Sequence, residues 1–124
     1  MQMTRAEFEH CVGLALEQIP ASFAPHLQNV VIEVENMPIA SQCEAVGVQN
    51  PKNLLGLYQG VPMTRRSVEQ YARLPDRILI YQANIQRICR TREALVEQIR
   101  KTVLHEVGHH FGLSEEDLDE LGYG

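Results

Sequence analysis

Long apolar runs are absent from this chain of 124 residues. No stretch approaches the roughly 20 consecutive apolar residues that a membrane-crossing helix needs. Residues 1–7 also lack the basic-then-apolar pattern of an export signal. We therefore expect a protein that has no membrane partner and works in the cytoplasm.

Cysteine is scarce and scattered. The chain has 3 cysteines, Cys11, Cys43 and Cys89, and no two of them show the C-x-x-C spacing of metal-binding or redox motifs. An odd, scattered set does not form the disulfide framework of a small secreted domain. Reduced thiols in a cytoplasmic protein are the simpler interpretation.

Positive charge is also in short supply. Lysine and arginine number 11 against 16 acidic residues, which gives a formal net charge of −5. Phosphate binding needs a concentrated basic surface, so this balance argues against a nucleic-acid partner. The local groups Arg65–Arg66 and Arg87, Arg90 and Arg92 are more typical of solvated loop and helix faces.

The composition that remains is that of an ordinary globular protein. Apolar residues make up 44% of the chain and charged residues 22%, which does not favour disorder. A chain of this length has room for one hydrophobic core. We expect a single domain that spans residues 1–124.

Hydrophobic periodicity predicts a helix at the N-terminus and three short strands. Residues 4–19 form an amphipathic helical pattern that begins with a capping box of Thr4 and Glu7. Residues 29–35, 54–59 and 77–81 are rich in β-formers and bounded by turn residues, which predicts strands. Residues 36–53 have little periodicity, so we expect an irregular connection. Residues 63–76 are polar, and we expect a loop with room for one helical turn.

A long helical pattern covers residues 84–111, with a break near Thr91 where the second part begins. Leu95, Ile99, Val103 and Val107 form one stripe at i, i+4 spacing, which should face the sheet. Gly112 follows at a helix-end position. Beyond it, Ser114 and Asp117 are typical of a cap for a last helix through Leu121. The fold class is therefore α+β: a small sheet packed on a long helix, with N- and C-terminal helices flanking it.

The chemistry is concentrated in His105, Glu106 and His109, an H-E-x-x-H motif at the end of this long helix. Positions i and i+4 differ by only about 40° around a helix, so both imidazoles can point at one ion. Zinc accepts imidazole nitrogen at about 2.0–2.1 Å. Glu106 projects beside the two histidines, where it can take a proton from a water molecule that the metal activates.

A third ligand is needed for a strong zinc site, and its identity stays open. Glu115 lies six residues beyond His109, with Gly112 providing the turn between them. Glu116 and Asp117 are alternatives, and a site without a third protein ligand is another. All three acidic residues would also be favourable at a helix N-terminus because of the helix dipole alone.

Other candidate residues favour structural roles. His110 lies about 140° around the helix from His105, so we expect it in the core or in support of the ligands rather than on the metal. Tyr58, Tyr81 and Tyr123 could each polarise a substrate carbonyl. Amphipathic packing is the more common role of a lone tyrosine.

Three segments together resemble a known family. Residues 55–62 (LGLYQGVP), 74–78 (LPDRI) and 105–112 (HEVGHHFG) are similar to segments of small bacterial zincin-like metallopeptidases with a minimal zincin fold. The resemblance implies zinc bound by His105, His109 and an acidic residue in the place of Glu115. The family's usual residue at that place is aspartate, and this chain has the longer glutamate.

The function that we predict is zinc-dependent hydrolysis of peptide bonds, with Glu106 as general base. The substrate would be a short peptide or a flexible protein segment, bound as an added strand at the edge of the strand near residues 78–81. One alternative is a zinc-binding, catalytically weak or inactive peptide-binding module. A more remote alternative is a metal-dependent ribonuclease, although the third histidine and the basic groove expected for one are missing. The sequence leaves the oligomeric state open.

Overall fold

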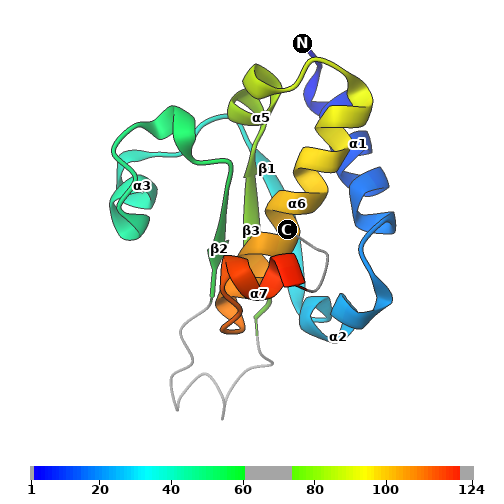
Figure 1. Cartoon of the computed structure of the whole chain (residues 1–124). Helices are drawn as coiled ribbons and strands as arrows, with labels where there is room; N and C mark the ends of the chain where they lie inside the picture. The colour runs from blue at the N-terminus through cyan, green and yellow to red at the C-terminus, as the bar shows by residue number, and fades with distance from the viewer. Residues whose placement is uncertain (1, 61–73, 121–124) are drawn as a thin grey trace.

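The computed structural model describes residues 2–60 and 74–120. It shows an α+β domain in which a 3-stranded sheet is packed against helices (Figure 1). The helices are α1 (Arg5–Glu17), α2 (Ala24–Leu27), α3 (Ala40–Val46), α5 (Gln82–Ile88), α6 (Arg92–His110) and α7 (Glu115–Glu120); η1 (Ala21–Phe23) and η2 (Pro51–Asn53) are 3-10 turns; and the strands are β1 (Val30–Glu35), β2 (Gly56–Gln59) and β3 (Asp76–Tyr81).

The strand order is β1-β3-β2, with β3 in the centre. β1 pairs with β3 in parallel, and β2 pairs with β3 antiparallel, so that Tyr58 lies opposite Ile78. All three predicted strands are confirmed within one or two residues. The predicted free edge at residues 78–81 is wrong, because β3 has a paired strand on both sides. In the described sheet the edge strands are β1 and β2.

The core lies between α6, α1 and the sheet. The predicted stripe on α6 is confirmed: Leu95, Ile99 and Val103 have no exposed surface. These side chains share one cluster with Phe8 from α1 and Ile78 from β3. Figure 1 shows α6 (yellow to orange) running between α1 and the strands. The motif at the end of α6 is thus carried by a helix that is held on two sides.

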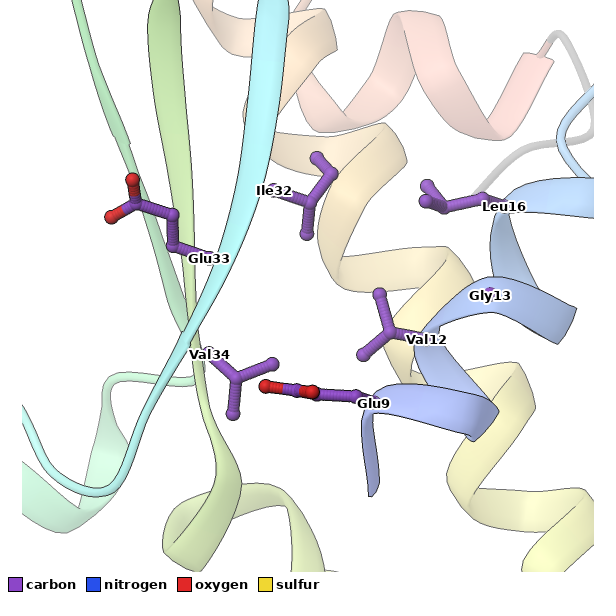
Figure 2. Close-up of a pocket in the computed structure, with 7 residues that line it drawn as sticks. All are labelled: Glu9, Val12, Gly13, Leu16, Ile32, Glu33 and Val34. Carbon is purple, nitrogen blue, oxygen red and sulfur yellow. The ribbon is translucent and has the colours of Figure 1, made fainter. Parts of the chain in front are cut away.

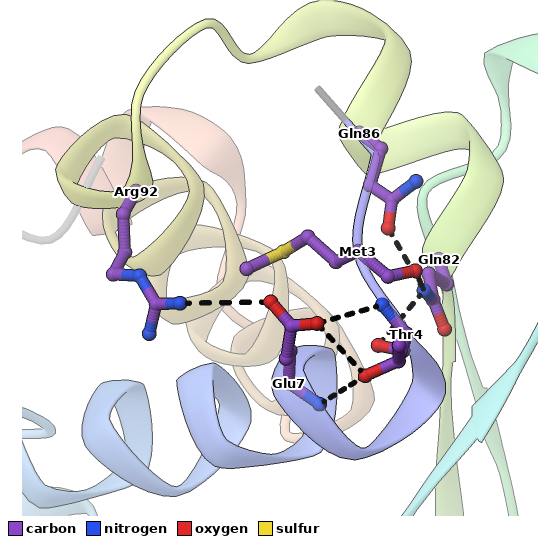
Figure 3. Close-up of polar contacts among 6 residues, drawn as sticks. All are labelled: Met3, Thr4, Glu7, Gln82, Gln86 and Arg92. Atoms are coloured by element: carbon purple, nitrogen blue, oxygen red, sulfur yellow. Dashed lines mark hydrogen bonds and ion pairs between the residues drawn. The ribbon is translucent and has the colours of Figure 1, made fainter.

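The N-terminal helix begins at the predicted capping box. Thr4 Oγ1 accepts from the Glu7 amide at 3.1 Å, and Glu7 Oε1 accepts from the Thr4 amide at 3.4 Å. Gln82 of α5 donates to the Met3 carbonyl at 3.1 Å, and Arg92 at the start of α6 lies 3.9 Å from Glu7 (Figure 3). The same contacts therefore cap α1 and attach it to α5 and α6.

The expectation of an irregular connection over residues 36–53 is wrong, because the structure has α3 and η2 there. Within α3 only Cys43 is buried, so the helix shows no apolar stripe that periodicity could detect. Local bonds define its ends instead. The Ile39 amide donates to Gln42 Oε1 at 3.1 Å, and Gly47 ends the helix with a φ of 73°. The predicted loop over residues 63–76 lies outside the described residues as far as residue 73. Its last residue, Asp76, is the first residue of β3.

The break in the long helical pattern is confirmed. Thr91 caps α6, and its side chain accepts from the Ala94 amide at 3.0 Å. At the other end, Gly112 has a φ of 86°, and the Leu113 amide donates to the Gly108 carbonyl at 2.7 Å. This hydrogen bond identifies a Schellman turn, which ends a helix and redirects the chain.

The last helix, α7, begins at the predicted cap. The Asp117 amide donates to Ser114 Oγ at 3.1 Å, and the Ser114 amide donates to Asp117 Oδ2 at 3.0 Å. Hydrogen bonding to the Ser114 backbone amide, and to the Ser114 side chain, lowers the pKa of the Asp117 carboxyl. Leu118 is fully buried beside Gly108, where it attaches α7 to α6. The predicted end of this helix at Leu121 lies outside the described residues.

The helices of residues 2–60 and 74–120 include none that is both long and apolar enough to span a bilayer.

Candidate active site

The predicted metal-binding histidines lie one turn apart near the end of α6. The ring centroids of His105 and His109 are 6.0 Å apart, with 37° between the ring planes. A tetrahedral ion bonded to both rings at about 2.0–2.1 Å would bring their centres to roughly 5 Å. Small side-chain rotations cover this difference. His105 is half-buried and His109 is exposed, so the pair opens toward solvent on one side.

Whether these residues suit a metal depends on whether a ring nitrogen is left without a hydrogen-bond partner. His105 Nε2 is buried and has no hydrogen-bond partner in the part of the chain that the structure describes. A buried polar atom without a partner costs free energy, about 1–3 kcal/mol, and is uncommon in native proteins. A metal bond would satisfy this nitrogen. His105 therefore fits a zinc ligand, and His109 lies close enough to bind the same ion.

Glu106 is held beside the histidines by the neighbouring strand. Its Oε1 accepts from the backbone amide of Tyr58 in β2 at 2.9 Å. Burial raises the pKa of the Glu106 carboxyl, while the Tyr58 hydrogen bond and the nearby His109 act in the opposite direction. One carboxylate oxygen is thus fixed by the backbone, and the side chain has the partly desolvated environment of a proton acceptor.

Three further side chains surround this contact, and spacing along the sequence did not identify them as a group. The Tyr58 hydroxyl donates to Asp76 Oδ2 at 2.6 Å, and His110 Nε2 lies 4.0 Å from the same oxygen. The rings of Tyr58 and His110 are stacked, with centroids 3.9 Å apart. The expected core position of His110 is wrong, because this residue is exposed. Its role in support of the ligands stays a prediction. Tyr81 is buried and donates to Gln42 at 2.8 Å, as expected of packing, and Tyr123 lies outside the described residues.

A groove follows β2 on both sides of Glu106. On one side, a hollow of about 390 Å³ contains Glu106, His109 and His110 and has an apolar wall, which consists of Val46, Val48, Leu54 and Leu57. On the other side, a hollow of about 250 Å³ contains His105 and Glu106 and has a polar wall, which consists of Asn53, Gln98, Lys101 and Thr102. Both hollows include Leu54, Gly56 and Glu106, so the glutamate lies where they meet.

Comparison with known protein families identifies the chain. A family model described as zincin-like metallopeptidase matches residues 27–124, which is well over half of the chain. The chain belongs to the zincin-like metallopeptidase family. The resemblance of its three segments is thereby confirmed, and so is the minimal zincin-like α+β fold.

A solved structure shows the same fold in another protein. It is a conserved hypothetical protein from T. thermophilus, with a TM-score of 0.55 and 20% sequence identity to this zincin-like chain. The match covers 95% of this chain and 99% of that one. At this identity the likeness concerns the fold alone. A search of curated proteins found no match.

Zincin-like metallopeptidases normally bind zinc, which agrees with the two histidines of this chain. The described residues, however, contain no cluster of three histidine, cysteine or acidic side chains close enough to share an ion. Glu115 and Glu116 are exposed in the first turn of α7, and Asp117 is engaged in the Ser114 cap. Glu115 as third ligand stays a prediction, and the cap bonds favour a structural role for Asp117.

A larger hollow, of about 640 Å³, lies elsewhere on this zincin-like domain, between α1 and β1 (Figure 2). Val12 and Leu16 of α1 face Ile32 and Val34 of β1 across it, and Glu9 and Glu33 also line it. None of the predicted site residues lines this hollow, so size alone does not indicate the active site.

Proposed function

We propose that this protein is a zinc-dependent peptidase that hydrolyses peptide bonds with Glu106 as general base. The observation that carries the proposal is the placement of Glu106. Its carboxylate is held beside two imidazoles by the Tyr58 amide, at 2.9 Å, and it lies in a groove of the surface. A glutamate on a solvated helix face with only a structural role would not need a backbone hydrogen bond, two neighbouring imidazoles and a position in a groove together.

In this proposal, His105, His109 and Glu115 hold the zinc ion. When bound, zinc supplies Lewis acidity, which polarises the substrate carbonyl and makes water a better nucleophile near neutral pH. The unsatisfied Nε2 of His105 supports its part as a ligand. Glu115 is the acidic residue that the family pattern places after Gly112, and the Schellman turn at Gly112 directs the chain back toward α6.

Glu106 carries the proton. The hydroxyl of the attacking water forms a bond to the carbonyl carbon, and the proton that it loses passes to the carboxylate of Glu106. The same carboxyl then returns this proton to the amide nitrogen as the carbon–nitrogen bond breaks, so that a free amine leaves. The Tyr58 amide occupies Oε1, which leaves Oε2 as the atom that exchanges protons.

The groove supports a peptide as substrate. An extended segment lying along β2 would pass the apolar wall on one side of Glu106 and the polar wall on the other. The edge strand β2 takes the place of β3 as the strand along which the peptide would lie. Side-chain contacts in the two hollows would hold it there, because the outward amide of Tyr58 is already bonded to Glu106. Both hollows are small, at about 390 Å³ and 250 Å³, so a short peptide or a flexible segment of a protein suits them better than a folded domain.

The proposal is tested by metal analysis and by peptide cleavage. The purified wild-type chain is expected to contain about one zinc ion per chain and to cleave members of a mixed peptide library, with products read by mass spectrometry. Glu106→Gln should keep the zinc and produce no fragments. Cleavage by the Glu106→Gln variant at the wild-type rate would contradict the proposed mechanism, because Glu106 would not be the general base.

A second candidate function is a zinc-binding module that binds peptides with weak or no hydrolysis. The observation in its favour is that the described residues bring two histidines together without a third ligand. The same experiment separates the two functions. Stoichiometric zinc and measurable peptide binding without fragments would favour the module.

A further inference from the structure

The three segments that carry the family resemblance meet at one place in the fold. Tyr58 comes from residues 55–62, Asp76 from residues 74–78, and His110 from residues 105–112. None of the three is a proposed zinc ligand, and none is the proposed base. Their side chains nevertheless form one connected cluster beside Glu106. The proposed mechanism assigns no role to this cluster.

The cluster joins three separate elements. Tyr58 of the edge strand β2 is stacked flat on His110 at the end of α6, with 14° between the rings. Its hydroxyl donates at 2.6 Å to Asp76 at the start of β3. Asp76 is 4% exposed, so the bond to its carboxylate is shielded from water, which strengthens it. The ring of Tyr58 is thus fixed on its face and at its hydroxyl.

The backbone of the same tyrosine holds the proposed base. The Tyr58 amide points away from β3 and donates to Glu106 Oε1. β2, from Gly56 to Gln59, is an edge strand that pairs only with β3 in the described sheet, so no further strand holds its outer side. Fixing the Tyr58 ring therefore fixes the amide, and fixing the amide fixes the carboxylate.

We propose that Tyr58, Asp76 and His110 form a positioning unit that places the Tyr58 amide so that it orients Glu106. None of the three side chains is assigned to bind the metal or to exchange the proton, and the consequence of the unit for rate rests on the proposed peptidase function. Loss of the unit leaves the base present but poorly oriented. Misplacing a catalytic group by about 1 Å can reduce a rate by about 100-fold, with little effect on substrate binding.

The first test does not require any activity. The full chain, purified with its metal, is labelled with ¹⁵N, and hydrogen exchange at the Tyr58 amide is measured by NMR. His110→Ala removes the stack from a partly exposed position and is expected to speed exchange at this amide by about tenfold. His110→Phe keeps an aromatic ring and should restore most of the protection. An unchanged rate in His110→Ala would overturn the positioning unit.

A matched control uses another tyrosine with a buried hydroxyl contact. Tyr81→Phe in β3 removes the bond to Gln42, while Tyr58→Phe removes the bond to Asp76 and keeps the stack. Only Tyr58→Phe should speed exchange at the Tyr58 amide, by less than His110→Ala does. Equal effects of the two variants would mean general loosening of the sheet and would contradict a specific unit.

The second test uses the peptide that the wild type cleaves best. His110→Ala should lower kcat by about tenfold or more and keep the zinc content, with recovery in His110→Phe. Any change in KM should be smaller than the change in kcat, although His110 also lines the hollow beside Glu106. A change in KM or zinc content with unchanged kcat would overturn the positioning role. If the wild type cleaves nothing, the proposed function fails, and the exchange measurements alone decide the positioning unit.

Discussion

Glu106 combines two conditions that normally oppose each other. A carboxylate in a partly buried place is destabilised as an anion, and its pKa rises. A hydrogen bond from a backbone amide stabilises the anion, and the Tyr58 amide supplies one. The side chain is therefore held in one orientation by a group that cannot itself exchange the proton. This is a suitable arrangement for a base that must act repeatedly in the same geometry.

The first prediction concerns the two imidazoles. His105→Ala and His109→Ala should each abolish stoichiometric zinc, because one imidazole and one carboxylate do not make a tight site. Metal content is measured by inductively coupled plasma mass spectrometry after dialysis. His10→Ala, an exposed histidine on α1, is the control and should keep the metal. Full zinc in the double variant of His105 and His109 would rule out the site.

The second prediction concerns Glu106→Gln. The amide oxygen of glutamine can still accept from Tyr58, so we expect an unchanged fold and unchanged zinc content. Hydrolysis should fall by about 100-fold to 10,000-fold, because an amide cannot accept the proton of water at neutral pH. The measurement is kcat/KM on one library peptide, with zinc content measured on the same sample. A loss of zinc along with activity would show that Glu106 acts as a ligand.

The third prediction separates the acidic residues of α7. Glu115→Ala should weaken zinc binding, measured by competition with a chelator, more than Glu116→Ala or Asp117→Ala does. Asp117→Ala should instead lower the melting temperature, because it removes the partner of the Ser114 cap. Equal zinc affinities across the three variants would remove Glu115 from the site.

At the scale of elements, the edge strand β2 lies unusually close to α6. A methyl group at Gly56 would come within 2.6 Å of Thr102 Cγ2 and 3.1 Å of the Leu79 carbonyl oxygen. Real Cβ atoms do not approach neighbours so closely, so any side chain there must push the strand away from the helix or from β3. Glycine at this position therefore allows the contact that brings Tyr58 to Glu106.

The fourth prediction is a pair of glycine substitutions. Gly56→Ala should destabilise the protein by about 1–3 kcal/mol in urea unfolding, because a packed contact becomes overfilled. Gly13→Ala in α1 is the matched control, since nothing lies within 4 Å of the added methyl group. It should stabilise by about 0.5–1 kcal/mol, because alanine favours a helix over glycine. The same sign for both variants would contradict the close approach of β2.

Most elements could be predicted from the sequence, but their arrangement could not. The α6 stripe, the Thr4 and Thr91 caps and the turn at Gly112 depend on residues within about one or two helical turns of each other. The central position of β3 depends instead on contacts between distant segments. The bond from Tyr58 to Glu106 spans 48 positions of sequence. The sequence did not predict helix α3 for a different reason. The contacts that define its ends are local, but the helix buries only Cys43 and so shows no apolar periodicity.

At the scale of the whole molecule, the core does not depend on the metal site. Phe8, Ile78 and Leu95 are fully buried in a cluster that α1, α6 and the sheet build from apolar side chains. The histidines lie at one end of α6, on the side that opens to solvent. Zinc should therefore add stability to a domain that is already folded, in contrast to small zinc fingers, which unfold without metal.

The fifth prediction follows from this arrangement. Removing zinc with a chelator should lower the melting temperature and leave the far-ultraviolet circular dichroism spectrum unchanged. At a zinc concentration of about 100 times its Kd, binding adds about 2.7 kcal/mol to the free energy of unfolding. Readdition of zinc should restore the melting temperature in wild type and leave His105→Ala unchanged. A random-coil spectrum in the chelated protein would mean that the metal is required for folding.

The bond between Glu106 and Tyr58 also bears on solubility. An edge strand presents unpaired amides, and such an edge can recruit a strand from a second molecule and begin aggregation. Here the outward amide of Tyr58 is already occupied by a carboxylate from the same chain. A negative charge at that point would also repel an identical edge in another copy. Glu106→Ala would therefore leave the outward amide of Tyr58 open to a strand from another molecule, in addition to removing the proposed base.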